Sequence, residues 1–243
     1  MKKLMIAAAA LTAGFAMADV VSSDIVGYAQ SGLQNGISLV SSQFLDVSGD
    51  VFSLENFKPT GNDVYGAVTI NKLDAYGFVV ATYTWTDAGG EGWDTPDVWV
   101  DDDNNIVENI TFAPGEGLMV GGSAASQGLQ SAGKVGTADV AIQLRNGASL
   151  CGNPFPVSVA LNDIYPTGED VYGAVSVNTL DAYGFVIATY TWTDAGGEGW
   201  DTPNVWVDDD NNIISDVDFN PGQGLWVNGA STTQYLQIPA PEL

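Results

Sequence analysis

The chain has no histidine, one cysteine and only six basic residues among its 243 residues. Without histidine it cannot build a Ser-His-Asp or Cys-His catalytic set, an imidazole-ligated zinc site or a histidine-ligated haem. The single cysteine, Cys151, cannot form a disulfide within the chain. It lies in SLCGNPF, which aligns with SLVSSQF around Val40, so we expect it to replace a small apolar core residue.

The scarcity of cations has a second consequence. Thirty acidic residues outweigh the basic ones and give a net charge of −24. Nucleic acid is excluded as a partner, because its binding needs clustered cations that neutralise phosphates. An anionic membrane surface is disfavoured for the same reason. Divalent cations and neutral glycans remain compatible, and the acidity also suits the solubility of an exported protein.

Long apolar runs are absent except at the N-terminus. Lys2 and Lys3 precede the apolar run Leu4–Ala16, which ends in the small-x-small pattern Ala16-Met17-Ala18. This pattern predicts a signal peptide over residues 1–18 and export to the periplasm, the cell surface or the medium. Cleavage leaves four basic against thirty acidic residues, a net charge of −26. The mature chain is predicted to have no membrane-spanning segment.

What the chain does have is a long internal repeat. Pro59–Gly122 recurs as Pro166–Gly229 at an offset of 107, with 49 of 64 positions identical. Upstream, Leu33–Phe44 matches Leu144–Phe155 at an offset of 111, which places a four-residue insertion within residues 45–53. A duplicated module favours repeated surfaces for assembly, adhesion or multivalent binding over a single asymmetric catalytic site.

The repeat predicts two domains of ordinary size, residues 19–132 and 133–243, joined near the small-residue stretch SAGKVG. The segment Asp19–Gln30 is β-prone. It is predicted to be the first strand of its own module, or a strand that adds to the sheet edge of a neighbouring subunit.

Each module has a β pattern throughout. In Phe78–Thr86, apolar side chains alternate with threonines at period two, which is typical of a strand buried on one side. The residues predicted to face the core are Val79, Ala81, Tyr83 and Trp85. Turn signals such as Asn35-Gly36 and Pro114-Gly115 are dense, and only Val51–Phe57 and Val159–Tyr165 suit a short helical turn. The predicted fold is all-β, with two tandem homologous β-sandwich or small β-barrel domains.

A family resemblance rests on four motifs. The openings SLVSSQF and SLCGNPF, together with the closings APGEGLMV and NPGQGLWV, resemble a group of secreted proteins from bacteria of the planctomycete–verrucomicrobial kind. The resemblance covers nearly all of both modules and implies tandem β-domains. It implies no activity and no catalytic residue. The first copy departs from the pattern at Ser42-Gln43, where the second has Asn153-Pro154.

An acidic turn, VDDDNNI, occurs once in each module. Alternate oxygens in it resemble the opening of a calcium-binding loop, although the later glycine and bidentate glutamate of an EF-hand are missing. A hairpin turn explains the same residues, because Asp and Asn are ordinary turn formers. The candidate calcium ligands are Asp101, Asp103, Asn105, Asp208, Asp210 and Asn212.

A tryptophan-containing loop, DAGGEGWDTP, is also duplicated. An aromatic face beside polar groups is what sugar recognition needs, and this loop supplies both; the alternative is a tryptophan that covers the edge of the core. The candidate glycan-binding residues are Trp93, Asp87, Glu91, Asp94, Trp200, Asp194, Glu198 and Asp201. Paired carboxylates of this kind can also hydrolyse glycosides when correctly spaced, but the sequence favours solvated loop charge over catalysis.

These patterns predict an exported, non-enzymatic structural or adhesive protein that associates with itself or with other surface proteins. The alternative is a bivalent carbohydrate-binding protein that uses the paired tryptophan loops. A secreted glycoside hydrolase is a third hypothesis. No cofactor is predicted apart from the candidate calcium.

Overall fold

The computed structural model describes residues 26–47, 49–87, 97–194 and 204–241. These residues form β-strands and two short 3-10 turns, so the predicted all-β class is confirmed. The turns η1 (Leu54–Asn56) and η2 (Leu161–Asp163) lie in the two segments where the sequence predicted a helical turn. Within the described ranges, no helix has the length and apolar character needed to cross a membrane.

The strands of the first module form three antiparallel sheets. The large sheet has the order β2-β9-β5-β6-β7, the second has the order β1-β10-β4, and the third pairs β3 with β8. The strand bounds are β1 (Val26–Gly32), β2 (Gly36–Ser41), β3 (Phe52–Ser53), β4 (Lys58–Thr60), β5 (Thr69–Leu73), β6 (Val79–Thr86), β7 (Val98–Val100), β8 (Thr111–Phe112), β9 (Gly117–Gly122) and β10 (Gly128–Lys134).

The second module repeats this arrangement strand for strand. Its sheets have the orders β12-β19-β15-β16-β17, β11-β20-β14 and β13-β18. The bounds are β11 (Val140–Gln143), β12 (Gly147–Gly152), β13 (Val159–Ala160), β14 (Tyr165–Thr167), β15 (Ser176–Leu180), β16 (Val186–Thr193), β17 (Val205–Val207), β18 (Asp218–Phe219), β19 (Gly224–Gly229) and β20 (Tyr235–Ile238). Each module thus consists of one five-stranded and two smaller antiparallel sheets, and the edge strands β2 and β12 of the large sheets each make a further bridge to the other module.

Each module has its own hydrophobic core between its sheets. In the first, Trp85 on β6 and Trp99 on β7 are cross-strand partners whose rings meet edge to face at 5.2 Å. The indole N–H of Trp99 donates to the carbonyl oxygen of Phe57 at 3.0 Å. The second module repeats the pair with Trp192 and Trp206. The predicted core position of Trp85 is therefore confirmed.

The burial pattern of β6 departs from the prediction at its first residues. Tyr83 and Trp85 are buried as predicted, but Val79 and its neighbour Val80 are both exposed. The prediction that Val79 faces the core is wrong, because this end of β6 belongs to a hairpin that extends to the other module, where Ala75 bonds to β12. Alternation along a strand shows which side chains share a face, but not where the opposing layer ends.

The N-terminal strand belongs to its own module. Over its whole length, Val26–Gly32, β1 pairs antiparallel with β10. Of the two predictions for this segment, the intramolecular strand is the one observed. Its exposed face alternates with a partly buried one, as expected for a strand that covers one side of a sandwich.

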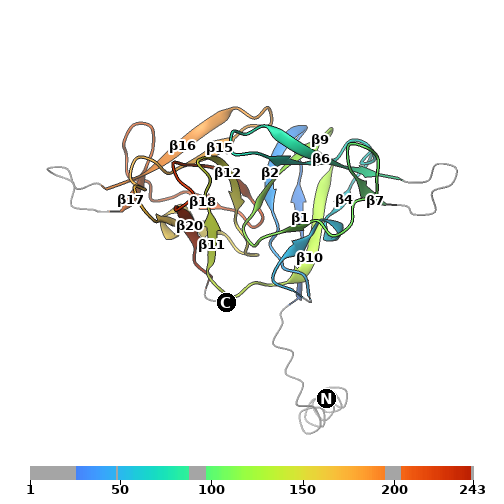
Figure 1. Cartoon of the computed structure of the whole chain (residues 1–243), viewed down its shortest axis with the longest axis horizontal. Helices are drawn as coiled ribbons and strands as arrows, with labels where there is room; N and C mark the ends of the chain where they lie inside the picture. Colours follow the sequence, from blue (N-terminus) through green and yellow to red (C-terminus); the bar gives the residue numbers. More distant parts are fainter. Residues whose placement is uncertain (1–25, 48, 88–96, 195–203, 242–243) are drawn as a thin grey trace, which may run out of the picture.

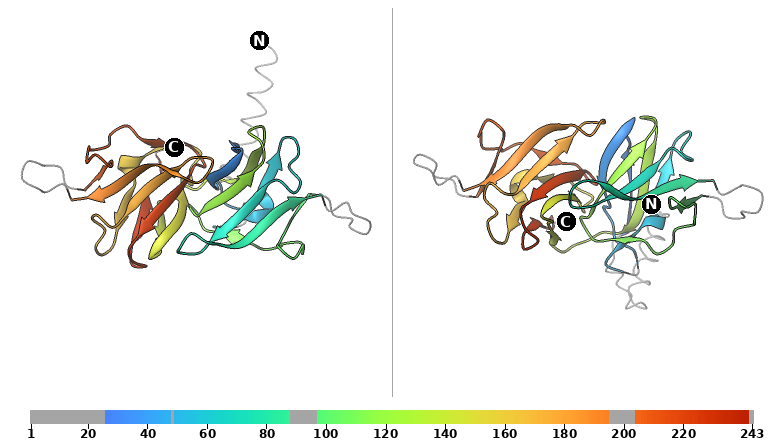
Figure 2. Two further views of the ribbon diagram at one scale, coloured as in Figure 1. Left: turned by 90° about the horizontal axis from the view of Figure 1, so that it is seen from above. Right: turned by 45° about the horizontal axis from the view of Figure 1, so that its top comes forward.

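The two modules lie side by side and meet along β2 and β9 of the first and β12 and β19 of the second (Figure 1). The backbone N–H of Ile37 donates to the carbonyl oxygen of Ala182 at 2.7 Å. At the equivalent repeat positions, Ala148 donates to Ala75, also at 2.7 Å. The junction therefore has an approximate internal two-fold axis, which is seen end-on in the left view of Figure 2.

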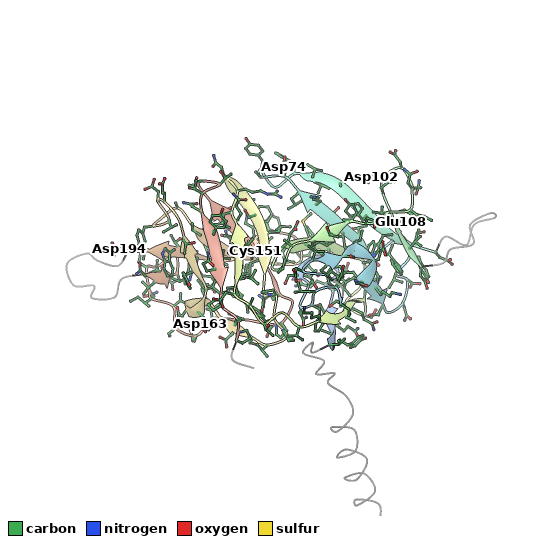
Figure 3. The ribbon with its side chains drawn as sticks, turned by 60° about the horizontal axis from the view of Figure 1, so that its bottom comes forward. Asp74, Asp102, Glu108, Cys151, Asp163 and Asp194 are labelled. Carbon is green, nitrogen blue, oxygen red and sulfur yellow. The ribbon has the colours of Figure 1, made fainter. Side chains whose placement is uncertain are left out.

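A second pair of bonds obeys the same symmetry. Ser41 N–H donates to the carbonyl oxygen of Gly222, and Gly152 N–H donates to that of Gly115, both at 2.9 Å. Cys151, fully buried as predicted, lies beside these bonds at the middle of the molecule (Figure 3). Burial raises the pKa of its thiol to about 12, so the group stays protonated and unreactive at neutral pH.

Candidate functional site

The β5–β6 and β15–β16 hairpins expose several large apolar side chains, which is unusual in a soluble domain. Asp74 starts the first hairpin turn, and its Oδ1 accepts the backbone N–H groups of Tyr76 and Phe78 at 2.8 and 2.9 Å. Gly77 then takes a φ of +85°, as in hairpin loops that close with a left-handed residue. Asp181 repeats these bonds in the second hairpin. The local sequence DAYGF therefore fixes the turn geometry in both copies.

Each hairpin rests on the opposite module. Gly77 lies so close to the indole of Trp226 that a Cβ atom would come within 2.7 Å of its Cη2. In the other direction, Gly184 packs against the side chain of Ile37, with a Cβ position 3.3 Å from its Cδ1. Together with the carbonyl bonds of Ala75 and Ala182, these contacts hold both hairpins in place.

The outward side of both hairpins is apolar. Tyr76 and Tyr183 are 81% and 79% exposed, and Phe78 and Phe185 are 69% and 70% exposed. The exposed apolar side chains of the two hairpins form what we call the hairpin face: Tyr76, Phe78, Val79, Val80, Tyr183, Phe185, Val186 and Ile187. Both hairpins lie on the upper side of the molecule in Figure 1, and Figure 2 shows them on opposite sides of the two-fold axis.

The hairpin face is also free of charge in a strongly acidic chain. Residues 75–80 and 182–187 contain no charged residue, although the chain has a net charge of −24. The carboxylates that flank the turns, Asp74 and Asp181, are hydrogen-bonded to the turn backbone. Several large apolar side chains exposed on one element are typical of interaction sites in soluble proteins. Reasoning from sequence missed it, although the duplicated YGFVV and YGFVI runs were a visible signal.

The acidic turns are hairpin turns in the structure. Asp101 Oδ1 accepts the backbone N–H groups of Asp103 and Asn105 at 3.0 and 2.8 Å and the Asn105 side-chain amide at 3.2 Å. Asn104 takes a φ of 60°. Hydrogen bonds from Asn105 lower the pKa of Asp101, and Asp208 has the same environment. The described residues contain no group of three or more acidic, cysteine or histidine side chains placed to hold a metal. Calcium binding at these turns stays a prediction.

Most of the predicted glycan site lies outside the described residues. Trp93, Glu91, Asp94, Trp200, Glu198 and Asp201 lie outside the described residues. Asp87 and Asp194 are exposed and directly follow β6 and β16. Figure 3 shows Asp194 at the end of the second module that is remote from the junction. Because only these two of the eight candidate residues are described, the glycan site stays a prediction.

Comparison with known proteins adds no further constraint. No protein-family model, curated protein or solved structure matches the chain. The resemblance to secreted proteins of planctomycete–verrucomicrobial bacteria therefore stays a prediction.

Proposed function

We propose that the chain is an exported, non-enzymatic structural protein that self-assembles through the hairpin face. Its place of action is the periplasm, the cell surface or the medium, as the N-terminal export pattern predicts. The observation that carries the proposal is the exposure of two equivalent apolar hairpins, each fixed against the opposite module. Because the hairpins are already held in place, an interface there costs little ordering entropy.

The partner that best fits this face is a second copy of the chain. A surface with two-fold symmetry can meet its own copy so that each contact occurs twice, as in isologous dimers. Charge supports the same choice, since copies of the mature chain, with four basic and thirty acidic residues, repel one another over most of their surface. The uncharged residues 75–80 and 182–187 are where that repulsion is weakest.

The test measures the size of the mature chain, residues 19–243, by multi-angle light scattering over a range of concentrations and by negative-stain microscopy. We expect concentration-dependent oligomers for the wild type. The Tyr76→Ser/Tyr183→Ser variant should shift toward monomer while its melting temperature is kept. The matched control is Tyr28→Ser/Tyr165→Ser, which removes two exposed tyrosines from the small sheets and should assemble like the wild type.

A wild type that stays monomeric at every concentration would overturn the proposal. So would equal assembly of the hairpin variant and the wild type. Parallel runs with calcium and with EDTA test the acidic turns: oligomers that are lost only in EDTA would assign the Asp101 and Asp208 turns a metal role in assembly.

Carbohydrate binding is the second candidate, and one observation favours it. Tyr76 and Tyr183 present almost fully exposed rings of the kind on which sugars stack. Retention on insoluble polysaccharide separates the two versions of this idea. Loss of retention in Tyr76→Ser/Tyr183→Ser places the sugar on the hairpin face. Full retention by a Trp93→Ala/Trp200→Ala variant would contradict the version based on the tryptophan loops.

A further inference from the structure

A cavity at the junction gathers half of the basic residues that follow the predicted signal peptide. Those residues are Lys58, Lys72, Lys134 and Arg145. Lys72 and Arg145 both line one cavity of about 370 Å³, a volume within the usual range of small-molecule sites. The walls come from β5 and the β8–β9 segment of the first module and from β11 and β12 of the second.

Arg145 is fixed at the wall of this cavity. Its Nη1 donates across the junction to the carbonyl oxygen of Leu73 at 2.7 Å. A guanidinium carries five N–H donors, and this bond is the one that it makes among the described residues. Lys72 makes no ion pair within the described part of the chain. Lys72 and Arg145 thus both line the cavity, and Arg145 retains N–H donors beyond the one that is bonded to Leu73.

Acceptors and apolar side chains complete the lining. Asp74 and Glu116 each bind backbone N–H groups through one oxygen, Oδ1 and Oε2 respectively. Their second oxygens accept no hydrogen bond from the described residues, so they remain available to hydroxyl donors. Pro114, Ile142 and Leu150 contribute apolar surface. The cavity thus combines donors for one anionic group, acceptors for hydroxyls and an apolar wall for a ring.

We propose that this cavity binds a small polyhydroxylated carboxylate of the hexuronate class. Arg145 and Lys72 bind the carboxylate, because a planar guanidinium matches its two oxygens and the ammonium adds charge. Asp74 and Glu116 accept hydrogen bonds from ring hydroxyls. The proposal is independent of self-assembly, since the cavity lining contains none of the exposed aromatic residues of the hairpin face.

The repeat supplies an internal comparison for this site. The second copy has Thr179 at the position of Lys72 and Gln223 at the position of Glu116. The first copy has Gln34 at the position of Arg145. The symmetry-related side of the junction therefore lacks all three charges. One hexuronate per chain is expected, although the modules themselves are duplicated.

The test titrates the mature chain with D-glucuronate and D-galacturonate by calorimetry, with D-glucose and D-galactose as neutral probes. We expect saturable one-to-one binding of at least one uronate and affinity lower by at least about tenfold for the neutral sugars. The Lys72→Thr/Arg145→Gln variant carries the residues of the other copy and should lose binding. Lys58→Gln removes a cation outside the cavity and should bind like the wild type.

Two further measurements keep the test decisive if the double variant is unstable. Lys72→Thr alone leaves the bond from Arg145 to Leu73 in place, so it should weaken binding without lowering the melting temperature. The uronate should raise the melting temperature of the wild type but not of the double variant. Absence of saturable uronate binding by the folded wild type would overturn the proposal, as would wild-type affinity in the double variant or an equal loss in Lys58→Gln.

Discussion

The carbonyl oxygen of Ala75 accepts a 2.7 Å hydrogen bond from the backbone N–H of Ala148, and this bond ties the hairpin of one module to the large sheet of the other. Gly147 makes the approach possible. It has a φ of +120°, and a Cβ atom there would lie 2.2 Å from the Ala75 oxygen. The junction thus depends on a residue without a side chain.

Gly147→Ala is therefore expected to destabilise the protein by about 2–4 kcal/mol, through backbone strain and the clash with Ala75. The measurement is chemical unfolding followed by far-UV circular dichroism. Gly173→Ala is the matched control, because Gly173 also has a positive φ, +69°, but open space around its Cβ position. Gly173→Ala should lower the free energy of unfolding by about 1 kcal/mol, through backbone strain alone. Equal losses in the two variants would show that the contact with Ala75 adds nothing.

Trp206→Phe should destabilise the second module by about 1–3 kcal/mol. The indole N–H of Trp206 donates to the carbonyl oxygen of Ile164 at 2.7 Å, and both residues are fully buried. Phenylalanine leaves that carbonyl without its donor. Trp226→Phe is the comparison variant: it removes a bond to the partly exposed side chain of Asn228 and a contact with Gly77, so a smaller loss is expected. A loss in Trp226→Phe as large as that in Trp206→Phe would contradict this account.

Alkaline pH should destabilise the wild type more than a Cys151→Val variant. Burial raises the pKa of the Cys151 thiol from its ordinary value of 9.0 to about 12. The unfolded chain therefore loses this proton first, and the stability that is present below pH 9 falls as pH rises toward 12. The loss is about 1.4 kcal/mol for each pH unit within that window. Valine is the residue at the equivalent position 40, so the variant should fold. Urea midpoints at pH 7 and pH 10.5 check the difference, and parallel declines would contradict it.

Acid should also destabilise the protein, through the turn aspartates. Hydrogen bonds from Asn105 lower the pKa of Asp101 below its ordinary value of 3.8. Stability from this carboxylate is therefore present above that value and is lost as pH falls through the lower, folded-state pKa. Asp101→Ala/Asp208→Ala should lower the urea midpoint at pH 5 and flatten its decline toward pH 2. Asp102→Ala/Asp209→Ala removes neighbouring carboxylates and should keep the wild-type decline; an equal flattening there would refute the assignment.

Much of each module could be predicted from sequence alone. Alternation identified Tyr83 and Trp85 as core residues, and the repeat itself implied that both modules would have one fold. The burial of Cys151 followed from its alignment with Val40. These predictions succeed because they depend on local periodicity and on side-chain size, and both follow directly from the residue types and their spacing.

The functional surface could not be predicted in the same way. The sequence pattern places Val79 and Val80 in an ordinary strand. Both are exposed, because their hairpin extends beyond its own module and bonds to the other one. Gly36 was predicted as a turn residue, but it also admits the carbonyl oxygen of Ala182 from a distant segment. The cavity needs residues from both modules, such as Lys72 and Arg145, which are 73 positions apart in sequence. Such features depend on how two complete modules pack, and no local pattern encodes that packing.

The internal two-fold axis has a consequence for how this chain can change. In a homodimer, every substitution at the interface appears twice, and the complex dissociates on dilution. Here both halves belong to one polypeptide, so their encounter is intramolecular and independent of protein concentration. Each half is also encoded separately. A charge such as Arg145 can therefore appear on one side of the axis while Gln34 stays on the other. Covalent fusion thereby permits symmetry breaking, in which an ancestral pair of equal surfaces becomes two surfaces with different tasks.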